Sequence, residues 1–233
     1  MATAATAKPA GSARKPSGQA AGARELTAQA TRERILKAAI KVFAKSGFAG
    51  GRVEQISRAA KSYDRMIYYY FGSKEKLFIA ALEEIYRRFC AAEAQIDLDL
   101  AQPAQALRTL VLFTWNYYQK HPEFITLLNS ENLHRGRHVS KSMRAREYSA
   151  TAISLLEGVL KSGIRTQVFR SDVDARDIYL TIASLSYFYL SNRFTLTAFL
   201  GENLEAPVAL AHWEEFITDA VLRVVAAPAA LLN

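Results

Sequence analysis

A short segment in the first third of the chain collects side chains that can bind a polyanion. It contains Tyr63, Asp64 and Arg65, then three consecutive tyrosines at 68–70, then Lys74. Tyrosine hydroxyls and lysine ammonium groups donate to phosphate oxygens, and arginine can bind guanine through two hydrogen bonds. These residue types in this order favour contact with a nucleic acid, with phosphates fixing the position and a few side chains reaching base edges.

The distribution of charge supports the same partner. Residues 1–77 contain 15 Lys and Arg against 5 Asp and Glu, a net charge of +10, whereas residues 78–233 contain 15 against 17, a net charge of −2. A basic module joined to a near-neutral body favours a polyanionic partner, such as double-stranded DNA, for the module only. The alternative is a solvated basic tail, but most of the excess lies beyond Lys8, Arg14 and Lys15.

Composition restricts the remaining classes of protein. Half of the 233 residues are hydrophobic, which predicts a globular body. The single cysteine, Cys90, excludes an internal disulfide framework and a cysteine-cluster metal site, and it fits a reducing cytoplasm. The longest apolar stretch, residues 178–192, is shorter than the roughly 20 residues that a membrane span needs. We therefore expect a cytoplasmic protein without a membrane partner.

The elements that would position these side chains are all helices. All six prolines fall in the N-terminal tail or near expected helix ends, and no stretch shows sustained period-two alternation. The pattern predicts an all-α fold with a flexible basic tail over residues 1–24. It predicts nine helices, at about 32–46, 53–60, 64–70, 74–95, 103–120, 122–135, 140–162, 175–200 and 207–225.

The second and third of these helices are short and joined by a tight turn, as in a helix-turn-helix. Ile56, Ala60, Ile67 and Phe71 can pack the pair against the first helix. This leaves outside the side chains of Tyr63, Asp64, Arg65, Tyr68 and Tyr69, whereas Tyr70 is expected in the core. We therefore divide the chain into the tail, a helix-turn-helix DNA-binding domain at 25–77, and a helical ligand-binding and dimerisation domain at 78–233.

The residues around this pair resemble a known family. The run Ile67–Phe78, IYYYFGSKEKLF, is similar to the signature of the TetR (tetracycline-repressor-like) family, and the segments 35–39 and 42–48 are similar to its first helix. The specific match covers about residues 32–82. The resemblance implies a transcriptional regulator, expected to be a repressor, that binds a palindromic operator as a homodimer and is released by a small-molecule effector.

The resemblance also implies roles for individual residues. Tyr68 and Lys74 are expected to contact phosphates, and Tyr69 a thymine methyl group or the backbone. The full set of expected DNA-binding residues is Arg52, Val53, Tyr63, Asp64, Arg65, Tyr68, Tyr69 and Lys74. One departure is the turn, where Lys61-Ser62-Tyr63 replaces the family's usual Gly-aliphatic-Ser, and a left-handed conformation at Lys61 would cost about 1 kcal/mol relative to glycine.

The body is expected to hold the effector and the dimer interface. Residues 175–200 are apolar nearly all round, so this helix must be buried on more than one side, either by a partner subunit or within the chain. An aromatic or carboxylate metabolite is the expected effector, although aromatic stripes can be simple core and His/Arg runs simple loops. The expected ligand contacts are Phe113, Trp115, Asn116, Tyr117, Phe124, Glu131, His134 and Arg137.

Two other classes of function were compared with this one. An enzyme would need a catalytic motif, and the chain has no HExxH, CxxC, GxSxG or phosphate-binding loop. His134 and His138 lie four residues apart, but the intervening Arg-Gly-Arg favours a loop, so no metal, cofactor or catalytic residue is predicted. A helical interaction module without DNA binding would leave the basic, tyrosine-rich segment without a purpose.

Overall fold

The computed structural model describes residues 18–142 and 144–228, and this part of the chain contains nine α-helices, one short 3₁₀ helix and no β-strand. The predicted all-α fold is confirmed. The helices are α1 (Gly18–Gly50), α2 (Val53–Ala59), α3 (Asp64–Phe71), α4 (Lys74–Glu93), α5 (Pro103–Lys120), α6 (Pro122–Leu133), α7 (Ala145–Arg165), α8 (Ala175–Leu200) and α9 (Pro207–Val225), with the 3₁₀ helix η1 at Val139–Lys141.

The start of α1 differs from the prediction. The helix begins at Gly18 rather than near residue 32, so residues 18–24, assigned to the tail, are helical, and residues 1–17 of that tail lie outside the described part. The stretch before residue 32 is rich in Ala and includes two Gln, and these residues favour a helix without any apolar stripe. The break expected at Gly47 is present, because its φ of 66° and ψ of 179° leave helical geometry.

Helices α1 to α3 form one small unit around a shared core. Ile35 and Phe43 of α1, Ile56 of α2 and Ile67 of α3 are fully buried. The turn between α2 and α3 keeps a left-handed residue although it has no glycine, because Lys61 adopts a φ of 48°. The turn therefore retains the tight shape that a helix-turn-helix needs, at the cost of about 1 kcal/mol expected for a residue with a Cβ.

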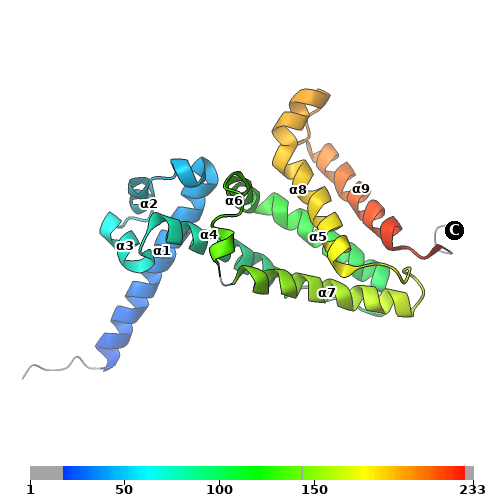
Figure 1. Ribbon diagram of the computed structural model, residues 1–233, viewed down its shortest axis with the longest axis horizontal. Helices are drawn as coiled ribbons and strands as arrows, with labels where there is room; N and C mark the ends of the chain where they lie inside the picture. The colour runs from blue at the N-terminus through cyan, green and yellow to red at the C-terminus, as the bar shows by residue number, and fades with distance from the viewer. Residues whose placement is uncertain (1–17, 143, 229–233) are drawn as a thin grey trace, which may run out of the picture.

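The three-helix unit joins the body through two helices. α1 packs against α4 and α6, and α4 continues into the body, where it contacts α7. α5 lies at the centre of the body against α7, α8 and α9. Figure 1 shows α1–α3 at one end of the molecule and the α8/α9 pair at the other. In the described residues, no helix is both long and apolar enough to cross a membrane.

Candidate functional site

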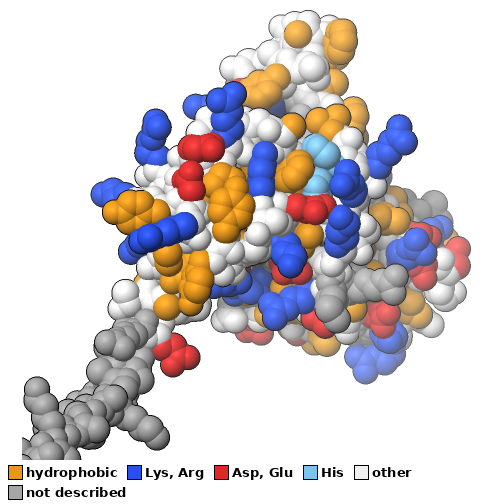
Figure 2. All heavy atoms as spheres, turned by 60° about the vertical axis from the view of Figure 1, so that its left-hand side comes forward, with side chains coloured by type: hydrophobic (Ala, Val, Ile, Leu, Met, Phe, Trp, Pro, Cys, Tyr) orange, Lys and Arg blue, Asp and Glu red, His pale blue; other side chains and the backbone are white. Residues whose placement is uncertain are grey.

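The outer surface of α3 presents aromatic side chains to solvent. Tyr63, Tyr68 and Tyr69 are 72%, 52% and 77% exposed, whereas the buried Ile67 and Phe71 hold the opposite face of the helix in the core. Tyr70 is half-buried against that core and meets Tyr69 edge to face, with ring centroids 5.0 Å apart. Figure 2 shows this end of the molecule with Lys and Arg side chains spread around exposed hydrophobic ones.

Arg65 lies beside this aromatic surface. It is exposed, and its guanidinium carbon is 5.4 Å from the centroid of the Tyr63 ring. A guanidinium over an aromatic face is held by a cation–π interaction of about 0.5–1 kcal/mol at an exposed site, which restricts its orientation without removing its hydrogen-bond donors. The first turn of α3 thus offers a planar donor group to the outside.

Asp64 occupies a different position from the one expected. The Ser57 hydroxyl of α2 donates a hydrogen bond to Asp64 Oδ1 at the start of α3. Since this carboxylate is half-buried and bound across the turn, it holds α2 and α3 at a fixed angle. Asp64 therefore has a positioning role inside the motif, and a base contact by this residue stays a prediction.

The start of α2 is ordered by its own side chains. Arg52, the exposed residue before α2, donates its backbone N–H to Gln55 Oε1 at 3.1 Å. Val53 is buried, so its side chain belongs to the core and only its backbone N–H can face a ligand. A helix start of this kind favours negative charge in front of it.

Lys74 is partly withdrawn from solvent at the start of α4. Its Nζ donates to the Ala49 carbonyl at 3.3 Å and lies 4.9 Å from the Phe48 ring centroid. Burial lowers the pKa of the Lys74 ammonium, while the nearby Glu54 carboxylate opposes this effect. The ammonium group is thus available for an additional anionic partner. Two further lysines are exposed, Lys61 in the turn between α2 and α3 and Lys76 in the first turn of α4. From the sequence, only these positions in a turn and a first helical turn could have indicated their exposure.

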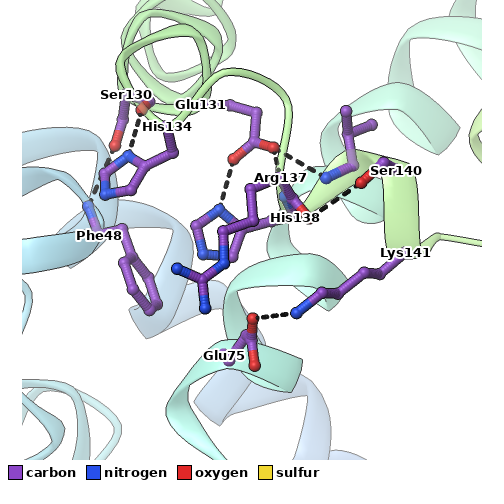
Figure 3. Close-up of polar contacts among 10 residues, drawn as sticks. Phe48, Glu75, Ser130, Glu131, His134, Arg137, His138, Ser140 and Lys141 are labelled. Carbon is purple, nitrogen blue, oxygen red and sulfur yellow. Dashed lines mark hydrogen bonds and ion pairs between the residues drawn. The ribbon is translucent and has the colours of Figure 1, made fainter.

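Glu131 and His138 form a buried polar pair between the three-helix unit and the body. Glu131 is 4% and His138 1% exposed. His138 donates through Nδ1 to Glu131 Oε2 at 2.7 Å, and the backbone N–H groups of His138 and Val139 donate to Oε1 at 2.7 and 2.9 Å. Figure 3 shows the carboxylate enclosed by these donors. All of its hydrogen bonds are internal, which corrects the expectation that Glu131 contacts a ligand.

Aromatic side chains of the three-helix unit and α4 close over this pair. The His138 ring lies 4.4 Å from Phe48 and 4.9 Å from Phe78, between centroids. His134 donates through Nδ1 to the Ser130 carbonyl at 2.8 Å, and the Ser130 hydroxyl accepts the Phe48 backbone N–H at 3.1 Å. The cluster therefore fixes the end of α1 to α6. His134 belongs to this contact rather than to a ligand site, and the exposed Arg137 lies beside it (Figure 3).

The other expected ligand residues are separated by the structure. Trp115 is fully buried and meets the Tyr189 ring edge to face at 5.6 Å, so it belongs to the core between α5 and α8. Phe113, Asn116 and Tyr117 line an open groove of about 520 Å³ along α5, on the outside of the body. Tyr117 is nevertheless buried, and the rings of Phe113 and Tyr117 lie 5.4 and 5.0 Å from that of Phe89 in α4, between centroids. The Asn116 side-chain amide donates to Glu214 Oε2 of α9 at 3.2 Å. Of the set, only Phe124 lines the interior cavity described next.

The interior cavity lies among the helices of the body. It has a volume of about 160 Å³, and α4, α5, α6, α7 and α8 contribute to its wall. Most of the lining is aromatic, with a thiol at one point. The lining residues are Tyr86, Phe89, Cys90, Tyr118, Phe124, Val139, Tyr148, Ala152 and Tyr179.

Glu93 borders a second, smaller space beside this cavity. It is 6% exposed, and its Oε2 has no hydrogen-bond partner among the described residues. Burial raises the pKa of the Glu93 carboxyl to about 7. Glu93 is not among the predicted ligand contacts, although its spacing of four from the buried Phe89 could have indicated a carboxyl on an apolar face.

The raised pKa of Glu93 predicts a pH-dependent cost in stability. A carboxyl whose folded pKa exceeds its unfolded value destabilises the fold increasingly as pH rises between the two, here from about 4.5 to about 7. In Glu93→Gln this cost is absent, so the variant should gain about 1–3 kcal/mol over the unsubstituted chain between pH 4.5 and pH 8. Urea unfolding at both pH values measures the difference. Glu157→Gln, at an exposed position of α7, is the matched control, and an equal pH dependence in all three proteins would contradict the prediction.

The described residues contain no group of three or more His, Cys, Asp or Glu side chains placed to hold a metal ion. The structure thus combines a three-helix unit, whose α3 exposes tyrosine and arginine side chains, with a helical body that has an internal cavity. Together they define a helix-turn-helix regulator class of protein.

Comparison with known proteins agrees with this class. Residues 35–81 match the sequence model of the tetR family of bacterial regulatory proteins, and residues 103–221 match that of the tetracyclin repressor-like C-terminal domain. The chain is 55% identical over 202 residues to the HTH-type transcriptional repressor NicS of Pseudomonas putida KT2440. The aligned region covers 87% of this chain and 95% of NicS. It is 31% identical over 110 residues to the HTH-type transcriptional repressor SCO4008 of Streptomyces coelicolor, covering 46% of this chain and 53% of SCO4008.

A crystal structure of SCO4942 from Streptomyces coelicolor has the same fold, with a TM-score of 0.63 at 22% identity over 85% of this chain and 99% of SCO4942. The chain belongs to the tetR family of bacterial regulatory proteins. It is a DNA-binding transcriptional regulator and not an enzyme.

Proposed function

We propose that the chain represses transcription as a homodimer that reads a palindromic operator with α3 and is released by a small molecule in the body. The observation that carries the DNA-binding part is the exposed surface of α3, where three tyrosines and Arg65 face solvent next to a basic surface. Repression is supported by the similarity to NicS, which is named as a repressor.

The DNA contacts follow from exposure and hydrogen-bonding capacity. Arg65 and Tyr63 are the base-reading side chains, because they stand together at the exposed start of α3. Tyr68, Tyr69 and Lys74 contact the backbone, since their groups donate to phosphate oxygens. A phosphate beside Lys74 would add to the negative charge that Glu54 already places near this partly buried ammonium. The contacts at α2 come from the Arg52 side chain and the Val53 N–H group.

The second subunit covers the α8/α9 surface at the far end of the body. Phe188 and Phe199 on α8 and Phe216 on α9 are 58%, 86% and 50% exposed, and other apolar side chains surround them. Exposed apolar surface on this scale favours a protein interface. A second copy is the occupant that fits, because a twofold dimer presents two reading helices to the two halves of a palindrome.

The effector site is the aromatic cavity of the body. Two structural elements connect this cavity to the DNA-reading unit. α4 begins at Lys74 on the DNA-facing side and carries Tyr86, Phe89 and Cys90 in the cavity wall. Val139 lines the same cavity, and its backbone N–H binds the Glu131 carboxylate that supports the contact with Phe48. A shift of α4 on ligand binding would change the spacing of the two reading helices, which must lie about 34–36 Å apart on DNA.

Release of the dimer from the operator requires only that the effector bind more tightly to the conformation whose two reading helices have the wrong spacing for DNA. A 100-fold difference in effector affinity corresponds to about 2.7 kcal/mol of coupling, and operator DNA must then weaken effector binding by the same factor.

The division into a DNA-binding domain at 25–77 and a ligand-binding and dimerisation domain at 78–233 is part of this proposal. α4 begins in the first domain and continues into the second. A regulator of bacterial genes must reach the chromosome, so we also place it in the cytoplasm.

Selection from random-sequence DNA duplexes tests this function. The unsubstituted chain should enrich a sequence with twofold symmetry whose half-sites are centred about 10 base pairs, or a multiple of that, apart. Its mass by analytical ultracentrifugation should be twice the 25.9 kDa of the chain.

Phe188→Lys should lower the mass to that of one chain and abolish enrichment, because it places a charge in the proposed interface. Leu133→Lys is the matched control, since Leu133 is 84% exposed on α6 and lies outside the proposed interface. A dimer that survives Phe188→Lys, or an enriched sequence without symmetry, would refute the proposed arrangement.

A further inference from the structure

The interior cavity has the size and the wall of a site for one aromatic ring. Its volume of about 160 Å³ is close to the roughly 150 Å³ in which a protein interior holds a benzene molecule. The Phe124 ring stacks on Tyr118 at 5.1 Å and meets Tyr86 edge to face at 5.5 Å, between centroids. Rings already arranged in stacked and edge-to-face pairs can add one more ring in the same geometries.

The polar feature beside the cavity is the Glu93 carboxyl. The space that it borders holds only about 20 Å³ and shares Phe89, Tyr118, Ala152 and Tyr179 with the larger cavity, so the two spaces adjoin. Glu93 is only 6% exposed, and its Oε2 accepts no hydrogen bond from the described residues. Buried polar atoms normally have partners, so an unpaired carboxylate oxygen beside a ligand-sized cavity indicates a missing donor.

The charges around the two spaces restrict the chemistry of the missing donor. The described residues that line them include no Lys, Arg or His, whereas Glu93 and four tyrosines are present. A carboxylate ligand would bring a negative charge into a wall without a cation to balance it, and its carboxylate has no hydrogen for Oε2 to accept. A ligand with a nitrogen-bound hydrogen would instead supply the donor that Oε2 lacks.

We propose that the cavity binds a single-ring aromatic molecule carrying a nitrogen-bound hydrogen, and that the Glu93 carboxylate selects it by accepting that hydrogen. The ring occupies the space between Phe89, Phe124 and the tyrosines, and its N–H group points to Oε2. The raised pKa of Glu93 agrees with this assignment, because burial disfavours the charged carboxylate until a donor or a cation reaches it. This inference rests on the proposed effector site.

The position of Glu93 also connects ligand chemistry to the DNA-reading unit. Glu93 is the last residue of α4, and Ser73 caps the first turn of the same helix by accepting the Lys76 N–H at 3.1 Å. A hydrogen bond to Glu93 therefore acts on the end of the helix whose other end lies beside α3. Of the three cavity residues of α4, Tyr86 and Phe89 contact the ring of the ligand, and Cys90 lies beside them in the wall.

The test is isothermal titration calorimetry of the full-length protein with three probes of similar size, namely 2-aminopyridine, toluene and benzoate. We expect 2-aminopyridine to bind about 10- to 100-fold more tightly than toluene or benzoate, as a charge-assisted hydrogen bond allows. Glu93→Leu should remove this preference and leave toluene binding within about twofold, and Glu93→Gln should reduce the preference. Glu157→Gln, on the exposed surface of α7, should leave all three affinities unchanged.

The outcomes separate this inference from the proposed function. Equal affinities for 2-aminopyridine and toluene, tighter binding of benzoate, or an unchanged preference in Glu93→Leu would each overturn the role of Glu93 while leaving the cavity a ligand site. Failure of all three probes to bind would overturn the effector site as well. DNA binding by the same samples, measured by fluorescence anisotropy, reports independently on whether the chain is a functional DNA reader.

Discussion

Raising the salt concentration from 50 to 200 mM is expected to weaken binding of the dimer to duplex DNA by about 10³- to 10⁵-fold, if it contacts 6–10 phosphates. Each phosphate neutralised by a basic group releases a bound cation, so the logarithm of affinity falls linearly with the logarithm of salt concentration. The net charge of +10 in residues 1–77 is the physical basis of this expectation. Fluorescence anisotropy with a labelled duplex at five salt concentrations gives the slope.

Deletion of residues 1–24 is the control for this experiment. Most of the basic excess lies in residues 25–77, so the shortened chain should bind somewhat more weakly but keep most of the slope. A slope near zero in the full chain would show that phosphates do not carry the binding. A slope lost with the tail alone would show that the tail, and not the helical unit, makes the phosphate contacts.

The second large effect is expected in the buried pair that joins the three-helix unit to the body. Glu131→Ala should lower the free energy of unfolding by about 1–3 kcal/mol or more, as the loss of the acceptor of buried hydrogen-bond donors does. The substitution leaves the His138 imidazole and two backbone N–H groups, of His138 and Val139, without an acceptor. Because the pair supports Phe48 and Phe78, the variant should also bind DNA less tightly.

A neighbouring surface ion pair provides the control for Glu131. Glu75 of α4 accepts from Lys141 Nζ at 2.7 Å across the same interface, but both side chains are partly exposed (Figure 3). Glu75→Ala should therefore cost little stability, because water and salt screen an exposed ion pair. Denaturant unfolding followed by circular dichroism compares the two variants, and equal losses of stability would contradict the structural role assigned to Glu131.

The helices of this fold were predictable because their ends are marked chemically. Pro103, Pro122 and Pro207 each occupy the first turn of a helix, and Gly47 and Gly72 adopt the positive φ values that interrupt or end one. The early start of α1 was not predictable from periodicity, because the residues before position 32 are helical without an apolar stripe. The left-handed Lys61 shows that a family turn can persist without its usual glycine.

The candidate sites were predictable to different degrees. Exposure of Tyr68 and Tyr69 follows from the period of α3, because its apolar positions define the inner face. Tyr63 lies before the first turn of this helix, so helical phase gives no information on its exposure. The environment of Glu131 does not follow from its helix, since its partners come from the loop at 138–139, seven and eight residues later. The cavity brings together side chains from five helices, and helical phase gives no information on which helices meet.

The central claim is that α3 reads DNA sequence through Arg65 while Tyr68 binds the backbone. Its most direct test is fluorescence anisotropy of the unsubstituted chain, Arg65→Ala and Tyr68→Phe on the selected duplex and on a scrambled duplex of equal length. We predict that Arg65→Ala loses about 1–3 kcal/mol on the selected duplex only, and that Tyr68→Phe weakens binding to both duplexes by a similar factor. An Arg65→Ala protein that keeps the full preference for the selected duplex would contradict the claim.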